Sequence, residues 1–257
     1  MSNINQAFAD GKAFGAYIPS GAPDLSTTAA CAREVVFNGA TFVVLSIPFS
    51  DPSGESPTIQ QANYKALEAG TTTDKVFALV KELRTDLKTP LALMTYANVV
   101  FSYGAEKFIS NCHEVGVDAL IVPDIPYEEK GEFLDYCRRL EVDLISFIAP
   151  ASPERIAKIA KDAEGFLYVM SGLDATSSCC KVMTDLPSIL GVARQNTNIP
   201  CIVDLDGIPA KQAAAISKLF DGVILRNAIV QLLSQHGQNA PKYIGELVKT
   251  TKANLQE

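Results

Sequence analysis

The fold of this chain is decided by the stretch AFGAYIPSGAPD, residues 13–24, which reads as a buried strand followed by a turn. Residues 13–18 form a near-continuous apolar run, the pattern of a parallel strand covered on both faces. A doubly wound nucleotide-binding sheet would place a G-x-G-x-x-G turn after its first strand, and PSGAPD lacks that spacing. The stretch therefore favours a closed barrel over a doubly wound sheet.

Further apolar runs follow along the chain, with amphipathic stretches between them. The predicted strands are residues 13–18, 41–47, 91–95, 119–122, 143–148, 165–171, 201–205 and 222–225. Helical spacing covers residues 28–38, 73–87, 104–115, 128–140, 153–162, 186–197 and 210–218, with a last helix over about 241–255. This alternation predicts an α/β chain with a single (β/α)8 TIM barrel and an extra C-terminal helix. Because no linker-like stretch divides it, we expect one domain over residues 1–257.

Two of the connections that follow predicted strands are long. They run from about residue 48 to 57 and from about 172 to 185. In barrels of this type the active site is built from the loops at the C-terminal ends of the strands. Connections of this length in a compact domain are often lids, so we expect the functional residues in and around these two loops.

Composition excludes several classes of protein. The net charge is −7 and Lys and Arg form no basic run, which argues against binding nucleic acid or an anionic membrane. Six cysteines form no C-x-x-C pair and only two histidines are available, so a zinc site is not supported. The first 14 residues lack the apolar core of a secretion signal, and no apolar run reaches about 18 residues. We therefore expect a cytoplasmic protein with reduced thiols.

Four motifs carry a resemblance to a known family. They are IPFSDP at residues 47–52, PTIQ at 57–60, MTYAN at 94–98 and VPDIP at 122–126. Together they resemble the tryptophan synthase alpha chain family over nearly the whole chain. The resemblance implies a lyase of tryptophan biosynthesis that cleaves indole-3-glycerol phosphate by a retro-aldol reaction to indole and glyceraldehyde 3-phosphate. It also implies no metal or organic cofactor, and pairing with a beta chain that receives the indole.

The family resemblance assigns roles on the indole side of the site. The family's catalytic glutamate lies three residues before the Ile-Pro of IPFSDP, and that position here is Val44, which cannot transfer a proton. Its second catalytic carboxylate maps onto Glu55, and a pocket tyrosine maps onto Tyr168. We expect Tyr17 and Tyr96 to line the same substrate pocket. The competing interpretations are a solvated loop glutamate for Glu55 and an ordinary barrel aromatic for Tyr168.

The phosphate side of the site departs from the family pattern at three loops. The loop after the sixth strand reads DATS instead of G-V-T-G, so Thr176 remains while both glycines are lost. The seventh strand ends with Asp204 and Asp206, and the eighth ends with Arg226 and Asn227. Two aspartates would repel a phosphate by about 4 kcal/mol at 4 Å and an effective dielectric near 20. We predict that Arg226 pairs with one or both aspartates and fills the phosphate position with an internal ion pair.

These residues leave three functions open. The first is an alpha chain that still cleaves indole-3-glycerol phosphate, as a lyase acting on carbon–carbon or carbon–oxygen bonds with reduced or altered activity. The second is a diverged barrel enzyme for another, possibly unphosphorylated, small molecule, since the acidic strand ends would suit an amine or an oxygen-bound divalent cation; these carboxylates could instead cap helices. The third is a non-catalytic subunit that binds a beta-chain-like partner through the loop that holds Asp51 and Pro52 and through residues 96–104.

Overall fold

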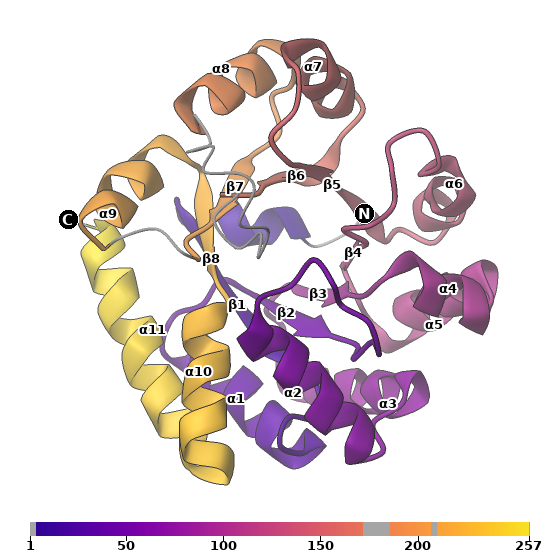
Figure 1. Cartoon of the computed structure of the whole chain (residues 1–257), viewed down its shortest axis with the longest axis vertical. Coiled ribbons are helices and arrows are strands. Elements are labelled where there is room, and N and C mark those ends of the chain that lie inside the picture. Colours follow the sequence, from indigo (N-terminus) through magenta and orange to yellow (C-terminus); the bar gives the residue numbers. More distant parts are fainter. Residues whose placement is uncertain (1–3, 172–185, 207–209, 257) are drawn as a thin grey trace.

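A computed structural model of the chain describes residues 4–171, 186–206 and 210–256. Eight parallel strands pair in chain order and β8 pairs with β1, which closes the barrel (Figure 1). The strands are β1 (Ala13–Pro19), β2 (Phe42–Ser46), β3 (Leu91–Met94), β4 (Ala119–Ile121), β5 (Asp143–Ile148), β6 (Glu164–Val169), β7 (Cys201–Asp204) and β8 (Gly222–Leu225). The predicted barrel is confirmed, and each predicted strand end lies within two residues of the observed one.

Helices surround the barrel as an outer ring (Figure 1). They are α1 (Leu25–Phe37), α2 (Pro57–Glu68), α3 (Thr73–Leu83), α4 (Ala97–Tyr103), α5 (Ala105–Val115), α6 (Gly131–Arg139), α7 (Pro153–Lys161), α8 (Leu186–Asn196), α9 (Ala210–Leu219), α10 (Asn227–His236) and α11 (Ala240–Gln256). The extra C-terminal helix is α11, which packs against α1. Three of these helices, α2, α4 and α10, were not among the predicted ones, and α2 and α10 begin beside the candidate site.

Alternate strand residues point into the barrel, as the two-residue repeat of a strand requires. Tyr17 lies opposite Val44, and Val44 lies opposite Ala92. The interior cluster is apolar and aromatic, and its strand members are Ala13, Tyr17, Phe42, Val44, Ala92, Met94, Ala119, Ile121, Ile145, Phe166, Tyr168, Ile202 and Ile224. The short 3-10 helix η1 (Ile4–Phe8) contributes Ile4 to this cluster, and its Phe8 ring lies 6.3 Å from that of Phe166.

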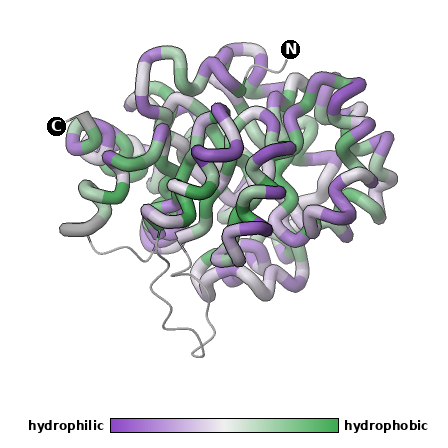
Figure 2. Tube along the Cα trace, turned by 90° about the horizontal axis from the view of Figure 1, so that it is seen from above, coloured by the Kyte–Doolittle hydropathy of each residue, from purple (hydrophilic) through white to green (hydrophobic). Residues whose placement is uncertain are grey.

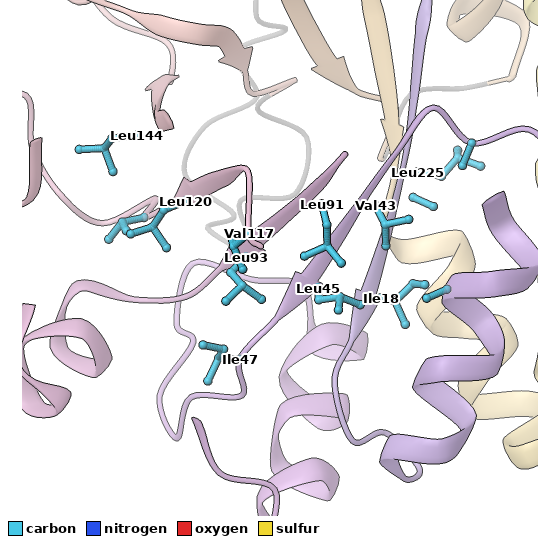
Figure 3. Packing of buried hydrophobic residues seen from close by; sticks show 14 of the residues in the cluster. Ile18, Val43, Leu45, Ile47, Leu91, Leu93, Val117, Leu120, Leu144 and Leu225 are labelled. Atoms are coloured by element: carbon cyan, nitrogen blue, oxygen red, sulfur yellow. The ribbon is translucent and has the colours of Figure 1, made fainter. Parts of the chain in front are cut away.

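The remaining strand residues point outward and pack under the helices. Figure 3 shows part of this cluster, in which Ile18, Val43, Leu45, Leu91 and Leu93 come from adjacent strands. Each such side chain stabilises the fold by about 1.5–3 kcal/mol when fully buried. In Figure 2 hydrophobic residues are concentrated inside the molecule, and hydrophilic residues lie along its outer turns. The barrel is thus a rigid support for the loops at its C-terminal end.

Among the residues that the structure describes, no helix combines the length and the apolar character needed to cross a lipid bilayer.

Candidate active site at the C-terminal mouth of the barrel

The C-terminal ends of β2, β7 and β8 bring three charged side chains to the mouth of the barrel. Asp204 is the last residue of β7, and Arg226 directly follows β8. Glu55 reaches them from the connection between β2 and α2, and all three are buried. Sequence analysis placed Asp204 and Arg226 together on the phosphate side of the site and Glu55 on its indole side; the structure brings Glu55 to Arg226.

Arg226 forms a buried ion pair with Glu55. The guanidinium Nη2 donates to Glu55 Oε2, and the two side chains are 3% and 9% exposed. The predicted pairing of Arg226 with Asp204 or Asp206 is therefore wrong in its partner, because the loop before α2 folds over the mouth and places Glu55 nearer. The solvated-loop interpretation of Glu55 is wrong for the same reason.

The surroundings of Arg226 keep its charge in place. Burial acts to lower the pKa of Arg226, but the neighbouring carboxylate of Glu55 raises it, and the net pKa lies well above the ordinary value. The guanidinium carbon lies 5.1 Å from the centre of the Tyr17 ring, a cation–π distance. Its Nε atom is buried and has no hydrogen-bond partner among the described residues. Arg226 thus remains charged, with one donor unused.

Asp206 occupies the start of α10. The backbone N–H of Asn227 donates to both of its carboxylate oxygens, with N···O distances of 2.9 and 3.1 Å. A carboxylate is favoured there because the first N–H groups of a helix have no partner within it and the helix dipole is positive at that end. The helix-capping interpretation therefore holds for Asp206. It holds also for Asp124, whose Oδ1 accepts from the backbone N of Ala97 at 2.9 Å, at the start of α4.

Two serines add polar contacts at the mouth, and sequence reasoning missed both. Ser171, just beyond β6, donates to Asp204 Oδ1 at 2.6 Å and gives this buried carboxylate a partner. Ser56 donates to Asn227 Oδ1 and is the N-cap of α2, so it joins the first turns of α2 and α10. The pair Ser56-Pro57 could have been found, because a capping serine before a proline is a signal for a helix start. Nothing in the sequence singles out Ser171.

Aromatic side chains form the floor and one wall of the mouth. Tyr168 packs against Phe147 with ring centres 4.4 Å apart, and Tyr96 stacks on Phe49 at 4.8 Å. Burial raises the pKa of Tyr17, Tyr96 and Tyr168 above the ordinary value, so all three hydroxyls are neutral at physiological pH. The hydroxyl of Tyr168 is buried without a hydrogen-bond partner among the described residues.

Val44 lies inside the barrel, one layer below this polar group. It is 1% exposed and belongs to the apolar interior cluster with Tyr17 and Ala92. Valine at this position offers no proton and no hydrogen bond. Of the other predicted site residues, Thr176 lies outside the described residues.

The loop with the IPFSDP motif forms an outer surface beside the mouth. Asp51 is exposed on it, whereas Pro52 is buried. A shallow depression joins this loop to α4, with a lining that includes Phe49, Asn98 and Tyr103. Phe101, on α4, is 49% exposed. The two segments that were predicted to face a partner therefore form one continuous surface.

The acidic residues of the mouth do not form a metal site in the described part of the chain. Within residues 4–171, 186–206 and 210–256, no three His, Cys, Asp or Glu side chains are grouped to hold an ion. The carboxylates of Glu55 and Asp206 are directed at Arg226 and at the start of α10.

Comparison with known proteins gives a consistent result. The family model described as "Tryptophan synthase alpha chain" matches residues 4–257. The tryptophan synthase alpha chain of Lacticaseibacillus casei is 35% identical over 249 residues, 97% of this chain and 94% of that one. That of Petrotoga mobilis is 32% identical over 254 residues, 98% of each chain. A crystal structure of tryptophan synthase subunit alpha from Legionella pneumophila superposes with a TM-score of 0.86 at 27% identity, covering 100% of this chain and 99% of that one.

Proposed function

Since the chain belongs to the tryptophan synthase alpha chain family, we propose that it acts as a non-catalytic alpha-type subunit, which binds a beta-chain-like partner. The observation that carries this proposal is Val44 in the barrel interior, where the family's mechanism requires a carboxylate. On this proposal the chain does not cleave indole-3-glycerol phosphate at a rate typical of the family. Its role is then exerted through the partner.

The chemistry of the family reaction supports this reading. Retro-aldol cleavage needs a group that moves protons at the substrate hydroxyl and at the indole carbon, and a positioned acid–base group contributes about 10²–10⁴-fold in rate. Val44 cannot supply this step. Glu55 is the remaining acid at the mouth that matches a catalytic position, and its carboxylate is paired with Arg226. A substrate would have to break that buried pair before it could use Glu55.

The outer surface supports a role in binding a partner. Apolar side chains exposed next to one another mark interaction sites more often than scattered ones do. Phe101 on α4 is half-exposed, and other residues of α4, among them Asn98 and Ser102, line the depression that runs to the IPFSDP loop. A second depression is lined by Asp51 of this loop and by Tyr64, which is exposed on α2. The surface formed by this loop and α4 lies outside the mouth, so a partner could bind it whether or not the mouth holds a ligand.

The catalytic half of the proposal is tested by measuring indole release from indole-3-glycerol phosphate. We expect turnover at least about 10²-fold below that of the L. casei alpha chain assayed in parallel, because the proton-transfer group is missing. Val44→Glu should not restore it, since Asp206 and the Glu55–Arg226 pair still occupy the mouth. Native turnover close to that of the control chain would contradict the proposal.

The partner half is tested by sedimentation velocity with the tryptophan synthase beta chain of L. casei. We expect a complex that Phe101→Asp weakens, because the substitution places a charge in a surface that must lose water on binding. Phe37→Asp is the matched control, since Phe37 is 86% exposed at the end of α1, away from α4. If no complex forms, or if both variants bind equally well, this surface does not bind a beta chain.

A second candidate function is supported by the unpartnered donors of the mouth. Buried polar atoms are nearly always hydrogen-bonded, so Tyr168 OH and Arg226 Nε favour a bound polar molecule. A diverged enzyme for a small unphosphorylated molecule would use these donors. A thermal-shift screen of unphosphorylated aromatic metabolites tests it, with Tyr168→Phe as the variant that should lose the shift. Absence of any shift that depends on Tyr168 would rule it out.

A further inference from the structure

Asp206 accepts hydrogen bonds from the backbone N–H of Asn227 at the start of α10, a group that could otherwise bind an external anion. Its two carboxylate oxygens accept from the first N–H of α10, a helix of ten residues, and its side chain is buried. A helix N-terminus of this kind is a ready position for a phosphate or carboxylate group. In this chain the anion is part of the protein.

We propose that Asp206 is a built-in anion, which occupies the anion position at the start of α10 and makes the barrel mouth select against phosphorylated ligands. The proposal does not depend on Val44 or on a beta chain, because it concerns binding at the mouth alone. It assigns to Asp206 a role in specificity and not in catalysis.

Two features would act together against a phosphate. The first is occupancy, because the N–H of Asn227 is already directed at Asp206. The second is charge, because Glu55, Asp204 and Asp206 are all buried at the mouth and the side chain of Arg226 is already paired with Glu55. A dianion placed at this helix start would therefore meet the buried carboxylate of Asp206 in a region screened little by water.

The guanidinium of Arg226 provides the second, independent observation. Its Nε is buried and has no partner among the described residues, and Arg226 directly precedes the first residue of α10. The donors that a phosphate needs are thus present, namely a helix N-terminus and an arginine with an unused N–H. What occupies the N–H group at the helix start is the carboxylate of Asp206. Removal of this carboxylate should therefore convert the position into an anion site.

The test measures the binding of inorganic phosphate by calorimetry and by ³¹P NMR, using the full chain. We expect no saturable binding by the native protein and a gain in affinity of about tenfold or more for Asp206→Ser, which vacates the position and keeps a capping hydroxyl. Asp206→Asn removes the charge but retains the side-chain shape, so its gain should be smaller. Circular dichroism verifies that each variant is folded.

Asp24→Ser is the matched control. Asp24 is the N-cap of α1, where its Oδ1 accepts from the backbone N of Thr27 at 2.7 Å, but no buried arginine precedes that helix. This variant should not gain phosphate binding. The proposal fails if the native protein binds phosphate as tightly as Asp206→Ser, if Asp24→Ser gains equally, or if the folded variants gain nothing. Should Asp206→Ser not fold, Asp206→Asn decides by the same criterion.

Discussion

Val44 lies inside the barrel on β2, at the position where the family resemblance predicts the catalytic carboxylate. Its neighbours in the adjacent strands are Tyr17 and Ala92, and the cluster around it is apolar and aromatic. A carboxyl group introduced there would be desolvated, which favours its neutral form and raises its pKa. The native valine avoids this cost.

Val44→Glu should therefore destabilise the barrel in a pH-dependent way. Because the folded-state pKa of the new carboxyl is raised, the folded state binds the proton more tightly than the unfolded state, and stability falls as pH rises above the ordinary value near 4.3. We expect a loss at pH 8 larger than that at pH 5 by roughly 1 kcal/mol or more. Urea unfolding at both pH values measures it, with Val44→Gln as the control that does not titrate. A loss independent of pH would contradict the argument.

The Glu55–Arg226 pair should show the energetics of a buried ion pair. Glu55→Ala leaves a buried guanidinium without its counter-ion, which typically costs about 3–5 kcal/mol. The double variant Glu55→Met/Arg226→Met should lose less than the sum of the two single variants, because it leaves no unpaired charge. Glu128→Ala is the comparison, since it breaks the exposed Arg155–Glu128 pair and should change stability little. Additive losses at the buried pair would show that the two charges are not coupled.

Single-residue predictions from the sequence were correct about location and wrong about pairing. The strand ends predicted that Asp204 and Arg226 meet at the mouth, because parallel strands end at one edge. The partner of Arg226 could not be predicted, since Glu55 lies 171 positions away and reaches the mouth only through the path of a loop. Long side chains and irregular backbone decide such contacts, and periodicity carries no information about either.

At the scale of elements, strands were easier to predict than helices. Each strand is a short apolar run, whereas the unpredicted α4 has only seven residues and its N-cap residue, Tyr96, makes no capping hydrogen bond with its side chain. The helices α2 and α10 were missed for another reason, because both directly follow motifs that drew attention as loops. Yet α2 has a clear start signal, Ser56-Pro57, equal to Ser152-Pro153 at the start of α7.

These two serine caps should differ in their contribution to stability. Ser152 accepts from the backbone N of Arg155 at 3.3 Å and has an exposed cap position, so Ser152→Ala should cost about 1 kcal/mol. Ser56 caps α2 and also donates to Asn227 of α10, so Ser56→Ala should cost more, about 2 kcal/mol, through the added buried hydrogen bond. Chemical denaturation of both variants measures the difference. Equal losses would mean that the link between α2 and α10 contributes nothing.

At the scale of the whole molecule, the barrel and its helical ring enclose nearly all the apolar residues of the strands. This is why eight apolar runs predicted the architecture so well. The polar residues of the mouth make individual contacts, and these contacts were predicted only in outline. The same enclosure covers the thiols of Cys31, Cys112, Cys137 and Cys201. Burial raises the pKa of Cys31 and Cys137 to about 12 and that of Cys201 to about 11.

These thiols should make the whole molecule less stable at alkaline pH. The thiol pKa is raised in the folded state, so the unfolded chain loses these protons first, and the free energy of unfolding falls as pH rises above the ordinary thiol value. Between pH 7.5 and 10 each such thiol should remove about 1.5–2 kcal/mol. Urea unfolding at both pH values measures the fall, and Cys31→Ala should reduce it.

Thiol reactivity provides the independent check on this enclosure. The variant Cys179→Ser/Cys180→Ser leaves the four buried cysteines as the reactive ones. Because the thiolate is the nucleophile and burial disfavours it, a disulfide reagent at pH 8 should label these cysteines slowly in the native protein and rapidly in urea. The native labelling rate should then follow the opening of the barrel, and it should rise with pH together with the loss of stability. Rapid labelling of all four thiols without urea would mean that the helical ring does not exclude solvent from the outer faces of the strands.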